Sequence, residues 1–183
     1  MQFVGYRFAE KNRDKKKIKI DRLVKSIRTA NKIGHTTKVN IVIGFPDDTL
    51  ASILKSAWFA VKMAIYGSED CTFTKFSPYP GSELYRRLRN ENKIPPPSDD
   101  YIRSLAGFMD FTKTESYCNQ VSGRTLTFLA FAMHGVFYSV AYLTHPKRIF
   151  RAIGNLAKKR FEPSNVLEQR LYDVFMREKL KIN

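Results

Sequence analysis

Two segments of the chain share one layout, in which a short apolar run leads into a loop marked by glycine or proline and then into an amphipathic stretch. They are VNIVIGFPDDT at residues 39–49 and TFTKFSPYPGSELY at residues 72–85. Strands that alternate with helices have this layout, and parallel strands bring their carboxyl ends to one edge of a sheet. The spacing fits one crossover helix between them. The two segments therefore predict an α/β protein with a ligand site at that edge.

The apolar periodicity extends this prediction along the chain. Strands are expected at 2–8, 39–45 and 71–76, and helices are expected at 21–33, 50–66, 82–92 and from Ser98 onward. The expected N-caps are Asp21, Thr49 and Ser82, and the expected helix ends are Gly34 and Gly67. Sequential strands in this order pair as parallel neighbours. Three strands cannot close a barrel, so we expect an open sheet that belongs to something larger.

Length and cysteine content restrict the class of protein. The 183 residues, 43% of them hydrophobic, suit one domain or one domain with an appendage. The two cysteines, Cys71 and Cys118, form no CxxC pair, so neither a disulfide framework nor a zinc site is predicted. Residues 1–20 are polar and basic, unlike a signal peptide. These observations favour a reducing, cytoplasmic location.

The net charge of +15 is concentrated at the two ends of the chain. Residues 1–40 hold 12 Lys and Arg against 3 acids, residues 41–124 hold 10 against 10, and residues 125–183 hold 10 against 4. A basic surface of this kind favours an anionic partner, either phospholipid or nucleic acid. A solvated surface, or a contact with acidic sequence outside these residues, is the alternative explanation.

Residues 125–146 form a run of 22 positions without a charged side chain, and a basic stretch follows Pro146. Polar residues such as His134 and Ser139 dilute the run. Three interpretations remain open: a core or subunit-contact helix, an interfacial helix on anionic lipid, and a membrane span. A last amphipathic helix is expected over 166–180. The chain is thus divided into a βα unit at 1–111, a linker at 112–123 and a helical, basic extension at 124–183.

The two opening segments and the basic, aromatic stretch after them resemble the second half of a radical S-adenosylmethionine (radical SAM) enzyme of the cobalamin-binding branch. That branch has a strand that reads roughly NFIIGFPGET and a later strand that ends in PYPGTELY, which are similar to 39–49 and 72–85. Its helical tail is similar to 125–160. The resemblance implies a partial βα barrel, in which the chain supplies about three parallel strands with crossover helices, followed by a helical tail.

The resemblance also implies a set of cofactor-binding positions. The strand at 39–45 would approach the adenine of S-adenosylmethionine, and the segment after the strand at 71–76 would lie beside it. The residues of this chain at the implied positions are Gly5, Arg7, Asn40, Val42, Gly44, Asp48, Phe76 and Pro78. In the complete protein the cofactors would be S-adenosylmethionine and a 4Fe–4S cluster, and the resemblance leaves the use of cobalamin open.

The chain departs from the family pattern at three places. The CxxxCxxC loop, whose three cysteines hold the cluster, has no counterpart here. Arg7 stands where the family often has an acidic residue, and Asp47-Asp48-Thr49 replaces the GET triplet. We therefore expect a C-terminal part that contributes the adenine-side wall of the cofactor site and does not cleave S-adenosylmethionine alone. The missing strands would come from an N-terminal half or from a complementary chain.

A function of another class fits the charge distribution as well. The chain would then be a non-catalytic basic module that binds an anionic membrane surface or RNA. Aromatic and basic side chains interleave over 137–161, and no RNA-binding motif is present, which favours lipid over RNA. On this interpretation the protein is cytoplasmic and peripheral on the membrane.

Overall fold

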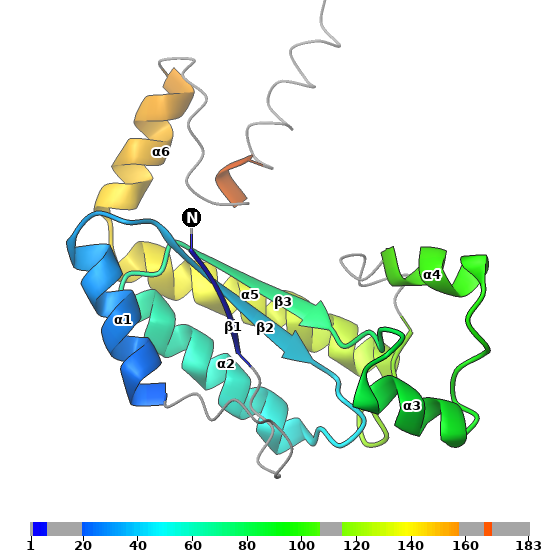
Figure 1. Cartoon of the computed structure of the whole chain (residues 1–183). Helices are drawn as coiled ribbons and strands as arrows, with labels where there is room; N and C mark the ends of the chain where they lie inside the picture. Colours follow the sequence, from blue (N-terminus) through cyan, green and yellow to red (C-terminus); the bar gives the residue numbers. More distant parts are fainter. Residues whose placement is uncertain (1, 7–19, 107–114, 158–166, 170–183) are drawn as a thin grey trace, which may run out of the picture.

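A parallel sheet forms the centre of the molecule (Figure 1). The computed structural model describes residues 2–6, 20–106, 115–157 and 167–169. Its strands are β1 (Gln2–Tyr6), β2 (Thr37–Ile43) and β3 (Asp70–Lys75), in the order β1-β2-β3 with both neighbouring pairs parallel. The prediction of a mixed α/β fold with a parallel sheet is confirmed. β2 and β3 end within two residues of their expected ends, shortly before a glycine or a proline, and positions 7–8 of the first expected strand lie outside the described residues.

Two helices connect the strands, α1 (Ile20–Lys32) and α2 (Leu50–Ile65). Thr49 caps α2 as predicted, accepting from Ser52 N while the Ser52 hydroxyl accepts from Thr49 N. Gly34 and Gly67 follow the two helices with φ of 84° and 98°, as the sequence predicts. Asp21 lies inside the first turn of α1, so its prediction as an N-cap is wrong.

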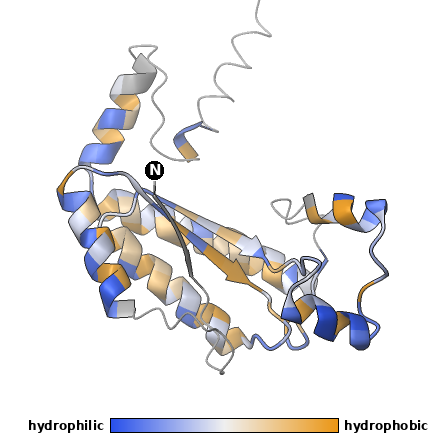
Figure 2. Cartoon of the chain, viewed as in Figure 1, coloured by the Kyte–Doolittle hydropathy of each residue, from blue (hydrophilic) through white to orange (hydrophobic). Residues whose placement is uncertain are grey.

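The main core lies between these helices and one face of the sheet. The pleat sends alternate residues of β2 to opposite faces. Val39, Ile41 and Ile43 are buried in the core, and they join Phe73 of β3 and Phe59 of α2 there. Figure 2 shows the carboxyl end of β2 in orange, the colour of hydrophobic residues. Burying this apolar face is the main stabilisation of the fold.

A long helix, α5 (Gly123–Thr144), covers the outer edge of β3. Its buried stripe, with residues from Leu126 to Ala141, packs against α2 and β3. The Phe73 N–H points away from β2 and donates to His134 Nε2 at 3.3 Å, and His134 Nδ1 lies 2.7 Å from Ala130 O. These contacts assign the Nδ1–H tautomer to His134. An edge that would otherwise present unpaired backbone groups is thus covered.

Of the described helices, α5 alone is long and apolar enough to cross a membrane by length and composition. Its buried stripe nevertheless makes it part of the main core, together with residues of the predicted 1–111 unit. The stripe matches the core-helix interpretation of 125–146. The outer side of α5 stays apolar, and Phe128, Phe131 and Leu143 are exposed there.

Three further helices complete the described chain. Past the carboxyl ends of the strands lie α3 (Glu83–Asn90), capped by Ser82 as predicted, and α4 (Asp99–Ala106) (Figure 1). The third, α6 (Lys147–Ala157), lies within the helical, basic extension expected over 124–183, although its own bounds were not predicted from the sequence. Most of the helix expected over 166–180 lies outside the described residues.

The second face of the sheet is only half-buried. Asn40 and Val42 of β2 and Thr72 and Thr74 of β3 alternate with the core residues, so they point to this face. All four are intermediate in exposure. Parallel sheets are usually covered on both faces and built of apolar residues throughout. The face carrying these four residues, called the open face below, is therefore the unusual feature of the fold.

Candidate functional site

The candidate site lies where the open face meets the carboxyl ends of the strands. Asn40 stands opposite Gly5 on one side and Thr72 on the other, and Val42 stands opposite Thr74. The sheet thus brings three predicted site residues together. Gly5 and Asn40 pair across β1 and β2, and Val42 lies two positions further along β2. Arg7 lies outside the described residues.

Asp48 shapes the loop that follows β2. One carboxylate oxygen accepts from the backbone N–H groups of Gly44 and Phe45, both at 2.9 Å, and the other accepts from the Ser52 hydroxyl at 3.2 Å. Asp48 is only 7% exposed. A carboxylate with several donors is fixed in place. Asp48 therefore holds the loop beside the predicted site by hydrogen bonds to the loop itself.

Gly44 begins this loop in a conformation that side chains avoid. Its φ is 82°, and a Cβ built at this position would lie 2.8 Å from Leu126 Cδ1 on α5. A left-handed backbone and a close approach are two reasons for glycine. Both reasons come from the folding of the chain itself and not from a ligand. Gly44 is buried at the junction of β2 with α5.

Phe76 and Pro78 lie in a second apolar core beyond the strand ends. Phe76 is 8% exposed, and its ring centroid lies 4.6 Å from that of Phe45. Pro78 is fully buried, and its carbonyl accepts a hydrogen bond from the Tyr101 hydroxyl of α4. Burial raises the pKa of Tyr101 to about 12, so this hydroxyl remains a donor. Val42 packs against the same cluster, which thus adjoins the open face.

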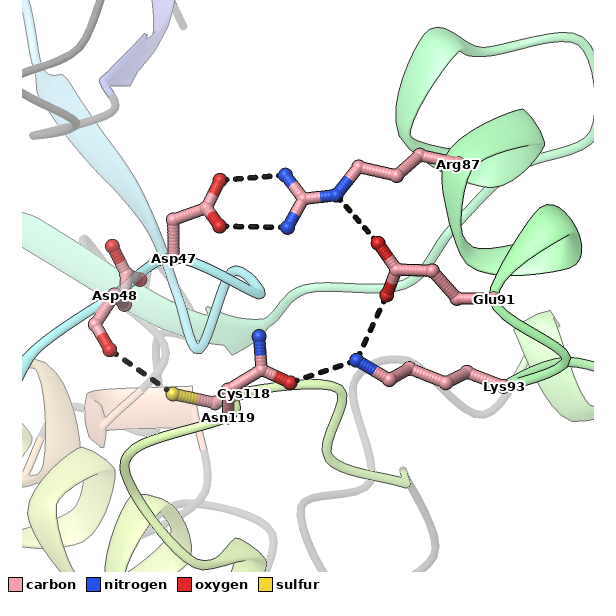
Figure 3. Close-up of polar contacts among 7 residues, drawn as sticks. All are labelled: Asp47, Asp48, Arg87, Glu91, Lys93, Cys118 and Asn119. Carbon is pink, nitrogen blue, oxygen red and sulfur yellow. Dashed lines mark hydrogen bonds and ion pairs between the residues drawn. The ribbon is translucent and has the colours of Figure 1, made fainter.

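A chain of polar contacts ties the loop after β2 to the surrounding segments (Figure 3). Arg87 of α3 donates to both carboxylate oxygens of Asp47, at 2.7 and 2.8 Å, and its Nε donates to Glu91 at 3.0 Å. Lys93 lies 2.8 Å from Glu91 and donates to Asn119 Oδ1 at 3.0 Å. The contacts hold the rim of the site from α3 to the segment before α5.

This network was not among the predicted site residues. The Arg87–Glu91 pair has the helical i,i+4 spacing, which the sequence alone would have indicated. Asp47 and Arg87 stand 40 positions apart, so no local pattern joins them. Ion pairs at such a surface contribute modestly to stability, typically about 0–1 kcal/mol each.

The polar network is expected to weaken in acid. Lys93, and then Arg87, hold the pKa of Glu91 below its ordinary value of 4.5. A lowered folded-state pKa means that the contribution is complete above 4.5 and declines as the pH falls through the folded-state value. We predict that Glu91→Gln lowers the free energy of unfolding at pH 7, and that its difference from the native chain shrinks below pH 4.5. Urea titrations across that range measure this difference, and a constant difference would contradict the prediction.

The cysteines of the chain do not fit a 4Fe–4S cluster. Cys71 is buried in the main core, where burial and then Asp70 raise the pKa of its thiol well above the usual value. Cys118 donates its S–H to Asp48 O at 3.3 Å. A cluster needs accessible thiolates that converge on one point. Among the described residues no group of three His, Cys, Asp or Glu side chains could hold a metal ion.

Comparison with known proteins does not identify a family for this chain. The chain matches none of the models of known protein families and none of the curated protein sequences. The interpretation of the site therefore rests on its own features, which are a half-polar open face, a glycine loop closed by Asp48 and an aromatic cluster at the strand ends.

Proposed function

We propose that the chain is the C-terminal part of a radical SAM-type enzyme and supplies the adenine-side wall of its cofactor site. Its sheet would be one section of a partial βα barrel, with the open face turned to the lumen. The 4Fe–4S cluster would be held by residues outside this chain, since the cysteines here do not fit it. The chain alone would therefore not cleave S-adenosylmethionine.

The open face is the observation that carries the proposal. Helices cover one face of a barrel sheet, and the other face is turned to the interior, where residues near the carboxyl ends of the strands reach the ligand. In the described chain α5 covers the β3 edge, whereas β1 is the last strand at the opposite edge. Further strands, from an N-terminal half or a complementary chain, would pair with β1.

The side chains of the open face suit a flat, polar-edged base. The Asn40 amide offers both a donor and an acceptor, and Val42 beside it offers apolar contact. Gly5, in the same row as Asn40, adds no side-chain bulk there. Phe76 and Phe45 belong to the aromatic cluster against which Val42 packs, so this cluster adjoins the open face. A site that combines apolar walls with a few oriented polar groups is typical of small-molecule pockets.

Backbone amide chemical shifts recorded during a titration test the proposal. S-adenosylmethionine and adenosine, at millimolar concentration, are expected to shift the signals of Asn40, Val42 and Thr72 in the native chain, whereas methionine alone is not. Asn40→Ala removes the amide and is expected to weaken the response to adenosine several-fold. Asn90→Ala, at an exposed position at the end of α3, is the matched control and is expected to leave the response unchanged.

Two outcomes would reject the proposed wall. One is the absence of shifts on the open face at ligand concentrations where the chain remains folded. The other is an equal response to cytidine and adenosine, because a wall that fits adenine should discriminate between the bases. A cluster assembled on the isolated chain, detected by its visible absorption and iron content, would contradict the expected lack of independent catalysis.

A second candidate function is attachment to an anionic membrane surface. The observation that favours it is the exposure of Ile149, Phe150 and Ile153 on α6, in a helix that also carries Lys147. An amphipathic helix with cations and exposed apolar side chains suits a membrane interface. Phe150→Asp is expected to lower sedimentation with phosphatidylglycerol vesicles, and unchanged sedimentation would reject this candidate.

A further inference from the structure

A groove between α1 and α2 lies apart from the site described above. It has a volume of about 680 Å³ and is lined by residues of both helices. The two helices turn Ile27, Ile53 and Phe59 toward the main core. The groove therefore runs along the helical side of the sheet, while Asn40 and Val42 occupy the opposite face. What binds in the groove is independent of the proposed cofactor wall.

Cations line the groove in two rows. Lys25, Arg28 and Lys32 follow one another along α1 at spacings of three and four residues, and Lys55 and Lys62 stand seven residues apart on α2. Residues at these spacings share one face of a helix. All five are exposed. Asp21 is the one acidic residue among the described side chains that line the groove. Positive charge thus gathers in a concave surface, which strengthens its attraction for an anion.

Two aromatic side chains lie in the groove between these rows. Trp58 is 59% exposed, which is unusual for the largest apolar side chain, and Lys62 Nζ lies 5.8 Å from its ring centroid. The Tyr66 ring has the Arg28 guanidinium carbon 4.9 Å from its centroid. The groove thus offers aromatic faces as well as cations to a ligand.

We propose that this groove binds single-stranded nucleic acid. Proteins that bind single strands without sequence preference combine a basic groove that follows the backbone with aromatic side chains on which bases stack. An acidic peptide would use the cations and leave Trp58 exposed. A bilayer would need a protruding apolar surface, whereas this surface is hollowed. The cations would contact phosphates, and Trp58 would stack on a base.

The basic surface continues past the end of the groove. A second hollow of about 580 Å³ shares Arg28, Lys32 and Tyr66 with the groove and extends to Lys147 of α6. Arg148 and Arg151, which also line it, are engaged with the backbone of residues 67–68 and with Glu69. A bound strand longer than the groove would therefore extend along α1 toward α6.

The groove contains its own reporter, because Trp58 is the one tryptophan of the sequence. A twelve-nucleotide oligouridylate is expected to quench the Trp58 fluorescence of the native chain. Each phosphate contacted changes the slope of log affinity against log salt by about −0.7 for a single strand. Five cations then give a slope of about −3.5. Neutralising two of them, in Lys25→Gln/Lys32→Gln, is expected to weaken binding about ten-fold at low salt and to reduce the slope by about 1.4.

Matched variants separate this site from general attraction to a basic protein. Arg86→Gln/Arg103→Gln removes the same charge at exposed positions of α3 and α4, and it is expected to leave affinity within two-fold of the native value. Trp58→Ala, followed by the anisotropy of a labelled oligouridylate, is expected to weaken binding about ten-fold. Circular dichroism melts identify any variant that fails to fold. If Trp58→Ala does not fold, Trp58→Phe replaces it, because phenylalanine retains an aromatic face for stacking.

Three results would overturn the proposal. The first is equal loss of affinity in the groove variant and in the α3–α4 variant, which would indicate non-specific attraction. The second is oligouridylate binding that leaves Trp58 fluorescence unchanged. The third is quenching by phosphatidylglycerol vesicles with none by oligouridylate, which would assign the groove to a lipid surface.

Discussion

Replacing Asp70 with alanine is expected to lower the free energy of unfolding by about 3–5 kcal/mol. Asp70 begins β3 and is fully buried. Its carboxylate lies 2.9 Å from Lys38 Nζ on β2 and accepts a hydrogen bond of 2.6 Å from the Tyr138 hydroxyl on α5. Burial, and then the charge of Asp70, raise the pKa of Tyr138 well above its usual range, so the hydroxyl keeps its proton and donates.

The loss follows from what alanine would leave behind. The Lys38 side chain is only 11% exposed, so its ammonium would remain buried without a counter-charge. Tyr138 would lose its acceptor at the same time, which adds the cost of a partly buried hydroxyl without that hydrogen bond. Because Tyr138 belongs to α5, the variant would also loosen the helix that covers the outer edge of β3.

Urea denaturation of four chains measures the effect. Lys38→Met/Asp70→Ala removes both charges and is expected to be more stable than Asp70→Ala alone, since it leaves no uncompensated ion. Asp100→Ala, whose side chain is 94% exposed, is the matched control and is expected to cost less than about 0.5 kcal/mol. A loss below about 1 kcal/mol for Asp70→Ala would show that the pair and its hydrogen bond contribute little.

The same network illustrates which parts of the fold could be predicted from the sequence. The strands and the caps at Thr49 and Ser82 follow from local patterns, and all of them are present. Asp70 and Tyr138 stand 68 positions apart, and their contact depends on how α5 docks against the sheet. Local sequence patterns do not predict how α5 packs against the sheet. The helix α6 falls within the expected helical extension over 124–183, but its bounds were not predicted, because its apolar residues are interleaved with basic ones.

The candidate site was predictable to a similar extent. The period of two in a strand places Asn40 and Val42 on one face, and the structure has them there. The surroundings of Phe76 and the hydrogen bonds of Asp48 were not predictable, since they depend on α3, α4 and the fold of the loop. Burial and polar contacts of loop residues come from tertiary packing, which a single sequence does not contain.

Gly44→Ala is expected to destabilise the fold by roughly 2–5 kcal/mol, from two separable causes. A side chain in a left-handed conformation costs about 1–2 kcal/mol, and φ is 82° here. Overpacking costs about 1–3 kcal/mol, and the new Cβ would lie 2.8 Å from Leu126 Cδ1. The conflict involves the first turns of α5, so the loop after β2 and the helix would have to move apart.

A double-mutant cycle with Leu126→Ala separates the two causes. Leu126→Ala alone is expected to cost about 2–5 kcal/mol, because Leu126 is fully buried. In that background Gly44→Ala is expected to cost only the backbone strain of about 1–2 kcal/mol. Gly135→Ala is the matched control: this glycine lies in α5 with nothing within 4 Å of a built Cβ, so alanine should stabilise the helix by about 0.5–1 kcal/mol.

The cycle also decides how much Gly44 contributes to the proposed cofactor site. An equal cost of Gly44→Ala in both backgrounds would show that Leu126 is not the cause, and the glycine would then be free to serve close approach of a ligand. A coupling of more than about 1 kcal/mol would show that α5 requires the glycine for packing. The support for an adenine-side wall would then come from the open face, where Asn40 and Val42 are half-exposed near the carboxyl end of β2.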